Sequence, residues 1–449
     1  MGGRRAFRRL QHAAAETGVI QDMTIEGQGV VSVDGKRVFI DGAIDGEAVS
    51  FRRLRAHRNY DEAELLAIDA PATQRVEPAC RYFGTCGGCS LQHLSPAAQL
   101  ALKERTLVEG LRRIGQVTPG RLMPAVTGPA WGYRRRARLG ARYVDGKGRV
   151  LVGFSERHGS WVTDMRHCEV LHPALAALVG PLADLIGGLS IRQRIPQVEA
   201  VVADNATALV FRVLEPPDPA DLDMLRAFRQ RHGLRLLLQT GGPDSLQPLD
   251  MEQDGGDLWY GIADSGLRMG FGPTDFIQVN SAINDSMIRL AVELLALGPG
   301  MRLLDLYCGI GNFTLPLAQR AGEVLGVEGA APMVTRARDN ARRNGIGNAT
   351  FALADLSTAD GAIPWAGQAF DAALLDPPRA GAAAIIEPLA RTGVRRILYV
   401  SCHPGTLARD AGTLVHGHGY RLAAAGILDM FPSTSHVESV ALFERERVP

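Results

Sequence analysis

A free thiol at the end of an apolar run is the feature of this chain that points most directly to chemistry. Cys402 follows the apolar run 396–400, where a buried parallel strand is expected to open into a loop. The carboxyl ends of such strands carry the ligands and reactive groups of open α/β sheets. A free cysteine is also commonly a small buried apolar residue. Taken alone, Cys402 leaves a nucleophile and a packed core residue both open.

A glycine turn and two carboxylates upstream of Cys402 predict a site for an adenosyl ligand. The segment 305–314 reads Asp-Leu-Tyr-Cys-Gly-Ile-Gly-Asn-Phe-Thr, and its glycines allow a ligand to approach the backbone before a helix begins. Glu328 ends the next expected strand, where a carboxylate can accept hydrogen bonds from ribose hydroxyls. Asp355 ends the third, where an adenine amino group can donate to it. Because the turn lacks the full Gly-x-Gly-x-x-Gly pattern that seats a pyrophosphate, it favours S-adenosylmethionine over NAD, the alternative.

The motif Asp376-Pro377-Pro378-Arg379 follows the fourth expected strand. It helps to decide which kind of atom accepts the methyl group. In methyltransferases that act on exocyclic amines, a related motif is followed by an aromatic ring that stacks on the target base, whereas this chain has Arg379. Together with Cys402, this departure points to methylation of carbon. Uracil C5 is a poor nucleophile, but a thiolate that adds at C6 pushes charge into an enolate whose C5 attacks a methyl sulfonium.

That chemistry sets three demands on the remaining side chains. The thiol must ionise near neutral pH, which needs a cation or a helix N-terminus, and Arg409 and the helix start near Thr406 are the candidates. Asp376 can accept the uracil N3 proton in a hydrogen bond and so select the base. A base must then remove the C5 proton, for which Glu438 is the candidate. Taken alone, Glu438 fits an ordinary surface carboxylate better than a catalytic base.

Three of the six cysteines cluster in the first quarter of the chain, as Cys80-x5-Cys86-x2-Cys89, and Cys168 lies further on. Their uneven distribution does not resemble a disulfide framework. The Cys-Gly-Gly-Cys segment suits zinc, a redox pair or an iron-sulfur cluster. Four thiolates with this spacing and no second Cys-x-x-Cys pair favour a [4Fe-4S] cluster over zinc.

Composition limits how this chain can contact a polyanion. Its 49 Lys and Arg against 48 Asp and Glu leave a net charge of +1, so nucleic acid can be bound only through local patches. The stretch 131–138 interleaves arginines with aromatic residues, which suits phosphate contact and base stacking, although a solvated strand edge is the alternative. The longest apolar stretch, 174–189, is interrupted by Gly, Pro and Asp, and no signal-peptide pattern follows the basic residues 1–10. We expect a cytoplasmic protein.

The sequence predicts three parts in an α/β chain of 449 residues. Residues 17–70 alternate apolar and polar positions around an Asp34-Gly35 turn, which indicates a small N-terminal β-barrel. Residues 76–270 form a central α+β domain that begins with the cysteine cluster. From residue 271 to 449, strands alternate with helix-length segments, the rhythm of a Rossmann-like, doubly wound parallel sheet with ligands at the strand ends.

At five segments the sequence resembles the RNA uracil-5-methyltransferases, specifically the iron-sulfur branch that modifies 23S ribosomal RNA. The segments are Phe-Ile-Gln-Val-Asn at 276–280, Asp-Leu-Tyr-Cys-Gly-Ile-Gly-Asn-Phe at 305–313, Asp-Pro-Pro-Arg at 376–379, Ser-Cys-His-Pro-Gly-Thr-Leu-Ala-Arg-Asp at 401–410 and His-Val-Glu at 436–438. The resemblance covers almost the whole chain and matches loosely from 174 to 261. It implies that residues 17–70 are a TRAM domain, an RNA-binding β-barrel of the OB-like kind.

The resemblance also implies roles for individual residues. Cys402 becomes the nucleophile and Glu438 the base, and Cys80, Cys86, Cys89 and Cys168 hold a [4Fe-4S] cluster with a structural or RNA-positioning role. The residues expected to line the pocket for S-adenosylmethionine and the base are Gln278, Tyr307, Gly309, Gly311, Asn312, Glu328, Asp355 and Asp376.

The substrate remains open between related RNAs. The combination of features favours a uridine of 23S rRNA, with transfer RNA position 54 as the alternative for the same chemistry. A non-catalytic RNA-binding or ribosome assembly factor is the alternative of another class. The intact set of Cys402, Asp376 and Glu438 disfavours it, because a scaffold has no need of all three. No membrane and no obligate protein partner are expected.

Overall fold

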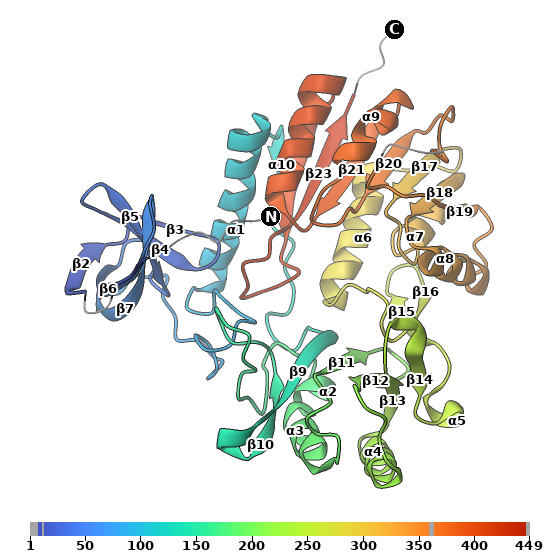
Figure 1. Cartoon of the computed structure of the whole chain (residues 1–449). Helices are drawn as coiled ribbons and strands as arrows, with labels where there is room; N and C mark the ends of the chain where they lie inside the picture. The colour runs from blue at the N-terminus through green and yellow to red at the C-terminus, as the bar shows by residue number, and fades with distance from the viewer. Residues whose placement is uncertain (1–7, 11–12, 359–362, 446–449) are drawn as a thin grey trace. The chain divides into compact units, whose positions relative to one another are not determined.

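The computed structural model describes residues 8–10, 13–358 and 363–445, and most of the basic N-terminal segment, 1–7, lies outside them. The chain forms two compact units. The first contains residues 1–103, 155–160 and 432–435, and the second contains residues 104–154, 161–431 and 436–449. Figure 1 shows the elements of both.

A curled sheet makes up most of the first unit. Its predicted hairpin is confirmed, since Asp34 and Gly35 have φ of 51° and 76° and Val33 pairs with Lys36. Alternate side chains, among them Val38 and Phe51, are fully buried on the inner face. Within the described residues the sheet has seven strands: β1 (Arg8–Arg9), β2 (Ala15–Val19), β3 (Asp22–Met23), β4 (Gln28–Val33), β5 (Lys36–Asp41), β6 (Ala48–Ala56) and β7 (Tyr60–Ala70).

The second unit contains a mixed sheet in the order β10-β9-β11-β12-β13-β14. Its elements are β9 (Arg136–Val144), β10 (Arg149–Gly153), β11 (Gln197–Val202), β12 (Thr207–Arg212), β13 (Leu234–Gln239), β14 (Leu246–Pro248), and helices α2 (Pro173–Ala176), α3 (Val179–Gly188), α4 (Pro219–His232) and α5 (Met251–Asp254). The apolar stretch 174–189 folds mainly as the buried helix α3. Among the described residues, no helix has the length and apolarity needed to cross a membrane.

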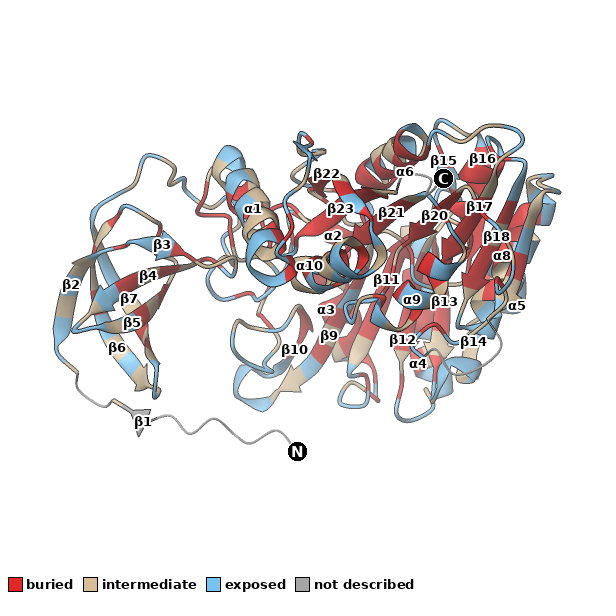
Figure 2. Ribbon diagram, turned by 90° about the horizontal axis from the view of Figure 1, so that it is seen from above, coloured by how far each residue is buried: buried red, intermediate tan, exposed pale blue. Residues whose placement is uncertain are grey.

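The larger sheet of the second unit confirms the predicted Rossmann-like fold. Five parallel strands, in the order β19-β18-β17-β20-β21, are followed by the antiparallel β23, by β22 and by the short β8 (Arg121–Leu122). Figure 2 shows these strands as mostly buried, with more exposed helices over them. The strands are β17 (Arg302–Leu306), β18 (Glu323–Glu328), β19 (Ala349–Leu353), β20 (Ala372–Leu375), β21 (Arg396–Ser401), β22 (Arg421–Leu428) and β23 (Glu438–Glu444). The helices of this part are α6 (Ser281–Leu295), α7 (Thr314–Ala318), α8 (Ala331–Arg343), α9 (Ala383–Arg391) and α10 (Pro404–Gly412), and α1 (Pro96–Gly110) has its first residues in the first unit and its last in the second.

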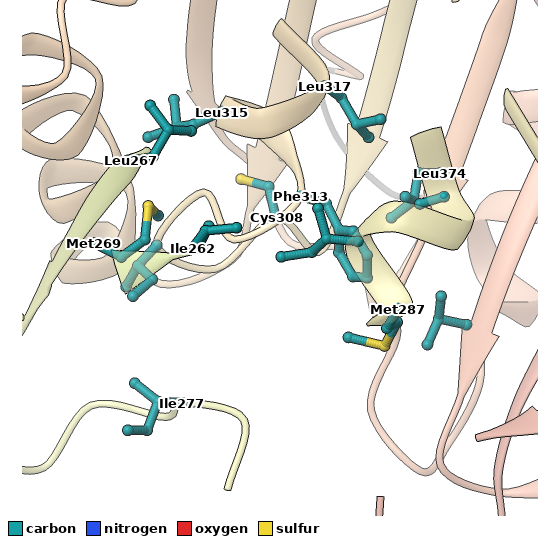
Figure 3. Close-up of a cluster of buried hydrophobic side chains, with 14 of the residues drawn as sticks. Ile262, Leu267, Met269, Ile277, Met287, Cys308, Phe313, Leu315, Leu317 and Leu374 are labelled. Carbon is teal, nitrogen blue, oxygen red and sulfur yellow. The ribbon is translucent and has the colours of Figure 1, made fainter. Parts of the chain in front are cut away.

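Chain order reverses between β17 and β20, which places a ligand crevice at the carboxyl ends of these strands. The turn after β17 is held from below by an apolar cluster. Figure 3 shows Phe313 and Leu315 of this turn and helix α7 beside Met287 of α6 and Met269 of β16, from the hairpin β15 (Leu258–Ile262)–β16 (Leu267–Phe271). The turn therefore lies on a packed core that fixes its backbone.

Candidate active site

The backbone between β17 and α7 is shaped for close approach of a ligand. Tyr307, Gly309 and Gly311 all have positive φ, of 64°, 54° and 93°. A Cβ added at Gly309 would meet no atom within 4 Å, so the backbone here borders open space. Glu328, at the end of β18, accepts hydrogen bonds from the amides of Gly309 at 3.1 Å and Ala330 at 3.0 Å. The predicted turn and the predicted carboxylate are thus in direct contact.

Other predicted pocket residues lie around the same turn. The Asn312 side chain exchanges hydrogen bonds with Asn284 of α6, at 2.9 and 3.1 Å, and its oxygen accepts one from the Tyr260 hydroxyl at 2.9 Å. Tyr307 donates to the Leu356 carbonyl at 3.0 Å. Gln278 is half-buried in the loop before α6. These contacts tie the turn to α6 and to the hairpin β15–β16.

Asp355 is the exposed member of the predicted pocket. Its carboxylate accepts hydrogen bonds from the Ser357 hydroxyl at 2.7 Å and the Ser357 amide at 2.8 Å. These bonds lower the pKa of Asp355, so it is an acceptor at neutral pH. An exocyclic amine that reached the end of β19 would find a ready partner.

Asp305, inside β17, is a buried carboxyl that the sequence analysis did not single out. One oxygen accepts a 2.5 Å hydrogen bond from the Thr314 hydroxyl, and the other is buried and has no hydrogen-bond partner among the described residues. Burial raises the pKa of Asp305 to about 7. Its hydrogen bond to Thr314 connects the end of β17 to the first residue of α7. The two ends of the glycine turn are thereby held together.

Cys402 lies half-buried one residue beyond β21, as the sequence predicts for a strand end. The loop around it is held by short-range bonds: Ser401 Oγ accepts from the His403 amide at 3.1 Å, and His403 Nδ1 caps α10 by accepting from Thr406 at 3.2 Å. Burial, followed by the charges of Glu438 and Asp376, raises the pKa of the Cys402 thiol. The thiol is therefore protonated at neutral pH in the unliganded site.

Two carboxyl groups share this site with the thiol. Burial raises the pKa of Asp376, which follows β20, to about 7. Burial and then the neighbouring charge of Asp376 raise the pKa of Glu438, at the start of β23, to about 8. These values lie close to neutral pH, where a carboxyl group can both hold and release a proton and so serve in general acid–base catalysis. Three strand ends thus bring Cys402, Asp376 and Glu438 within electrostatic reach of one another.

The cation that faces this group is Arg379 rather than the predicted Arg409. The charge of Arg379 lowers the pKa of both Cys402 and Glu438. Its Nη2 lies 2.9 Å from Nδ1 of His436, two residues before Glu438. Arg409 instead forms an ion pair with Asp410 at 2.7 Å, so its charge is compensated on α10.

Asp410 joins two loops of the site. This fully buried carboxylate accepts hydrogen bonds from the Tyr399 hydroxyl at 2.7 Å and the Ala382 amide at 2.8 Å, in addition to its bonds with Arg409. Gly381, with φ of 81°, fits closely, because an added Cβ would lie 2.7 Å from Asp410 Oδ2. The segment after Arg379 is thereby fastened to the helix that follows Cys402.

Within the described residues, none of the predicted cluster cysteines forms a disulfide: Cys86 and Cys168 are buried, and Cys80 and Cys89 are half-buried. The Gly88 amide donates to Cys86 Sγ at 3.4 Å, a backbone contact of the kind that tunes cluster sulfurs. Among the described residues, no three His, Cys, Asp or Glu side chains converge to hold a metal ion. The four-cysteine ligand set therefore stays a prediction from the sequence.

The basic stretch 131–138 is largely engaged within its own unit. Arg135 pairs with Asp204, and Arg136 and Arg138 share Glu199, each at 3.0 Å. The side chains of Arg135 and Arg136 are 14% and 15% exposed, and that of Arg138 is 68% exposed. Ion pairs within the unit thus account for the charges of Arg135 and Arg136, so these two residues need no RNA contact. The Arg138 side chain is exposed to solvent.

Comparison with solved structures agrees with the fold. The chain superposes with a TM-score of 0.72 on the Pyrococcus abyssi tRNA (uracil-54, C5)-methyltransferase in complex with S-adenosyl-L-homocysteine, at 23% identity, covering 95% of this chain and all of that one. At that identity the likeness is one of fold. A family model described as tRNA (Uracil-5-)-methyltransferase matches residues 242–446.

Comparison with curated sequences is closer. The chain is 51% identical over 421 residues to the Thiobacillus denitrificans 23S rRNA (uracil(1939)-C(5))-methyltransferase RlmD, covering 94% of this chain and 97% of the relative. It is 49% identical over 443 residues to the protein of that name in Methylococcus capsulatus, covering 99% and 100%. By this near full-length identity and the glycine turn, thiol and carboxyl groups described above, the chain belongs to the RNA uracil-C5-methyltransferase family, among the relatives of RlmD.

Proposed function

We propose that this protein transfers the methyl group of S-adenosylmethionine to C5 of a specific uridine in 23S rRNA, forming 5-methyluridine. The observation that carries the proposal is that Asp376 and Cys402, just after the parallel strands β20 and β21, lie at the same edge of the sheet as Glu438, the first residue of the antiparallel β23. Relatives that are about half identical over nearly the whole chain carry this activity in their names. RNA is the proposed partner, with the target base turned out of its stack into the pocket.

The methyl donor fits the crevice beside the glycine turn, where the backbone at Gly309 borders open space. S-adenosylmethionine supplies an electrophilic methyl group on a sulfonium. The residues proposed to hold it and the base are Gln278, Tyr307, Gly309, Gly311, Asn312, Glu328, Asp355 and Asp376. Glu328 already binds the amide of Gly309, so it is oriented toward the turn before any ligand arrives.

The proposed reaction begins with the thiol. Cys402 gives its proton to solvent water, and its thiolate sulfur forms a bond to uracil C6 while Asp376 accepts a hydrogen bond from N3–H. The charge that reaches C5 and O4 makes C5 nucleophilic, and C5 takes the methyl group as the methyl–sulfonium bond breaks. Glu438 then removes the proton from C5, the bond between C6 and sulfur breaks, and the Cys402 thiolate is released.

Fluorine at C5 tests this sequence of bonds. In RNA that carries 5-fluorouridine the last proton is missing, so the adduct forms and cannot collapse. We expect the protein and RNA to remain covalently joined on denaturing gels when S-adenosylmethionine is present. Cys402→Ala should form no adduct, and an adduct that survived this change would reject Cys402 as the nucleophile. A wild-type protein that forms none would favour the non-catalytic RNA-binding alternative.

The identity of the RNA is tested by mapping the product. A deletion strain should lack 5-methyluridine at one position of 23S rRNA and keep it at position 54 of transfer RNA. The reverse pattern would assign the same chemistry to transfer RNA. Because ribosomal RNA is made and processed in the bacterial cytoplasm, we propose that location for the enzyme.

We further propose that Cys80, Cys86, Cys89 and Cys168 hold a [4Fe-4S] cluster with a structural or RNA-positioning role, since the methyl transfer needs no electron. Two observations support this proposal: all four side chains are thiols, and the Gly88 amide donates a hydrogen bond to Cys86 Sγ. Protein purified without oxygen should absorb broadly in the visible range and contain iron and sulfide. A colourless protein that contains zinc would overturn this assignment.

The three predicted parts complete the proposal. Residues 17–70 are proposed as a small TRAM β-barrel that binds RNA, and the curled sheet of the first unit supports this. Residues 76–270 are proposed as the cluster and RNA-binding domain, and 271–449 as the catalytic domain. RNA binding by an isolated 17–70 fragment is not required, because the barrel is proposed to act as part of the whole chain.

A further inference from the structure

The region around β9 and β10 combines positive charge with an exposed aromatic ring. From residue 131 to 154 the sequence has seven Lys and Arg side chains and one Asp side chain, and three of these arginines pair with Asp204 or Glu199. Acidic partners are shared: Asp164 binds both Lys147 and Arg149 at 2.7 Å. Each shared carboxylate leaves one positive charge uncompensated, so this surface attracts a polyanion.

Trp161 is the exposed ring. Its surface is 58% exposed, and the guanidinium carbon of Arg142 lies 4.8 Å from the ring centroid. Arg142 is on β9, two strand positions beyond Gly140 and on the same face as Arg138. A guanidinium that stacks on an indole holds it in place and adds a second flat, charged surface.

Two opposed glycines make room for the segment that carries this ring. Gly140 of β9 pairs with Gly153 of β10. An added Cβ would lie 3.1 Å from Val162 at Gly140 and 2.7 Å from Met165 at Gly153. Residues 162–165 therefore pack closely over the two glycines, where the sheet has no side chains. This packing places the Trp161 ring against the Arg142 guanidinium. A solvated loop has no need of such close support.

We propose that Trp161, stacked on Arg142, is a platform for an unpaired base of the RNA substrate other than the target uridine, with Lys147 and Arg149 near its phosphates. Base stacking on exposed aromatic rings beside cations is how proteins hold single-stranded RNA without reading its sequence. The inference rests on the proposed function and adds a position on this chain where the RNA is held. It concerns binding, so it is separable from the chemistry at Cys402.

The test compares two tryptophans that carry the same contact. Trp161→Ala and Trp259→Ala are made in the full chain, because Arg268 also lies 4.8 Å from the Trp259 ring, on the hairpin β15–β16 outside the basic region. Dissociation constants and KM are measured with unmodified 23S rRNA transcript at fixed salt. Since stacking contributes about 1–3 kcal/mol per base, Trp161→Ala should weaken RNA binding about tenfold, with kcat at saturating RNA and affinity for S-adenosylmethionine unchanged.

Conservative variants separate stacking from folding. Trp161→Phe keeps a ring and should retain most of the affinity, and Arg142→Lys keeps the charge but should lose part of it, because an ammonium does not stack. Binding of Trp161→Ala within twofold of the wild type, or equal losses in Trp161→Ala and Trp259→Ala, would overturn the proposal. An RNA that binds but is not methylated by the wild type would reject the proposed function and leave this surface standing.

Discussion

In the proposed mechanism, Cys402 becomes a nucleophile only when the substrate is bound. In the unliganded site its pKa is raised by burial and by the charges of Glu438 and Asp376, and the cation opposing them is Arg379. Binding of uracil N3–H by Asp376 ties up one of these negative charges, and the guanidinium then acts on the thiol with less opposition. Ionisation is in this way coupled to the presence of the correct base.

The pH dependence of methylation follows from the same groups. The thiol and Glu438 must both lose protons, and the pKa values of Asp376 and Glu438 are about 7 and about 8. We expect single-turnover rates to rise from pH 6 to pH 9. Arg379→Ala should shift this rise to higher pH, because Arg379 lowers the pKa of Cys402 and Glu438, while Arg379→Lys should restore part of the shift. An unshifted profile in Arg379→Ala would contradict this electrostatic role.

Glu438→Gln should stop the reaction after the methyl group has moved. Glutamine keeps the size of the side chain but cannot remove the C5 proton, and a general base contributes roughly 100-fold to 10,000-fold in rate. We expect ordinary uridine RNA to remain covalently attached to this variant, with multiple turnover reduced at least about 100-fold. The adduct is measured on denaturing gels, with Glu438→Gln/Cys402→Ala as the control. Free methylated RNA at the wild-type rate would assign the proton removal to another group.

At the scale of elements, the site depends on a connection between two loops. Asp410 of α10 binds the Ala382 amide and the Tyr399 hydroxyl, so the segment from Asp376 to Ala382 and the helix after Cys402 are held together. Both ends of this connection are buried. Asp410 therefore helps to set the distance between Asp376, the carboxyl group proposed to bind the base, and the Cys402 thiol.

Asp410→Asn should slow adduct formation without weakening binding of S-adenosylmethionine. The amide cannot accept all the bonds that the carboxylate accepts, and a misplacement of about 1 Å can reduce rate about 100-fold. We expect both the rate of adduct formation and kcat to fall by that order, with Tyr399→Phe showing a smaller loss. Asp339→Asn, which removes an exposed pair with Arg342 on α8, is the matched control. If Asp410→Asn changes KM for the methyl donor but not the adduct rate, the connection does not position the thiol.

Strand ends could be predicted from the sequence because apolar runs mark buried parallel strands. The run 396–400 before Cys402 gave the position of β21 to within a residue, and Glu328 ends β18 as expected. The cation beside the thiol could not be chosen this way. Arg409 is closer to Cys402 in sequence, but its partner Asp410 is adjacent, while Arg379 reaches the site from another strand end.

The buried polar residues also could not be predicted from the sequence. Nothing in the pattern separates Asp410, which is fully buried, from the exposed acids of other helices. Its partners Ala382 and Tyr399 are 28 and 11 residues away and meet it only after folding. The Trp161 platform was missed for the same reason, since Arg142 and Trp161 are brought together by two glycines on different strands.

Over the whole molecule, charge is nearly balanced but unevenly placed. The net charge of +1 gives little general attraction for RNA, and near β9 and β10 two cations, Lys147 and Arg149, share the single carboxylate of Asp164. Binding should accordingly weaken with salt in proportion to the few phosphates contacted locally. We therefore expect low affinity for RNA in general and higher affinity for RNA with an unpaired base that can stack on the Trp161 ring.

The stability of the protein should fall with rising pH at its buried carboxyl groups. Asp305 has a pKa of about 7 in the folded chain, above its ordinary value, so unfolded chains release this proton first as pH increases. The destabilisation develops from about pH 4 and is complete once pH exceeds the folded value. Asp305→Asn has no proton to lose, so its unfolding temperature relative to the wild type should rise between pH 5 and pH 8. A constant difference would show that Asp305 is ionised in the folded protein.

The buried Asp410 carboxylate has a consequence for redesign. A redesign of this protein for another pyrimidine should replace the 376–382 loop and helix α10 together. Replacing either one alone would lose the hydrogen bond between the Ala382 amide and Asp410. Natural variation is under the same restriction, so new base preferences in this lineage should appear through paired changes on both sides of that joint.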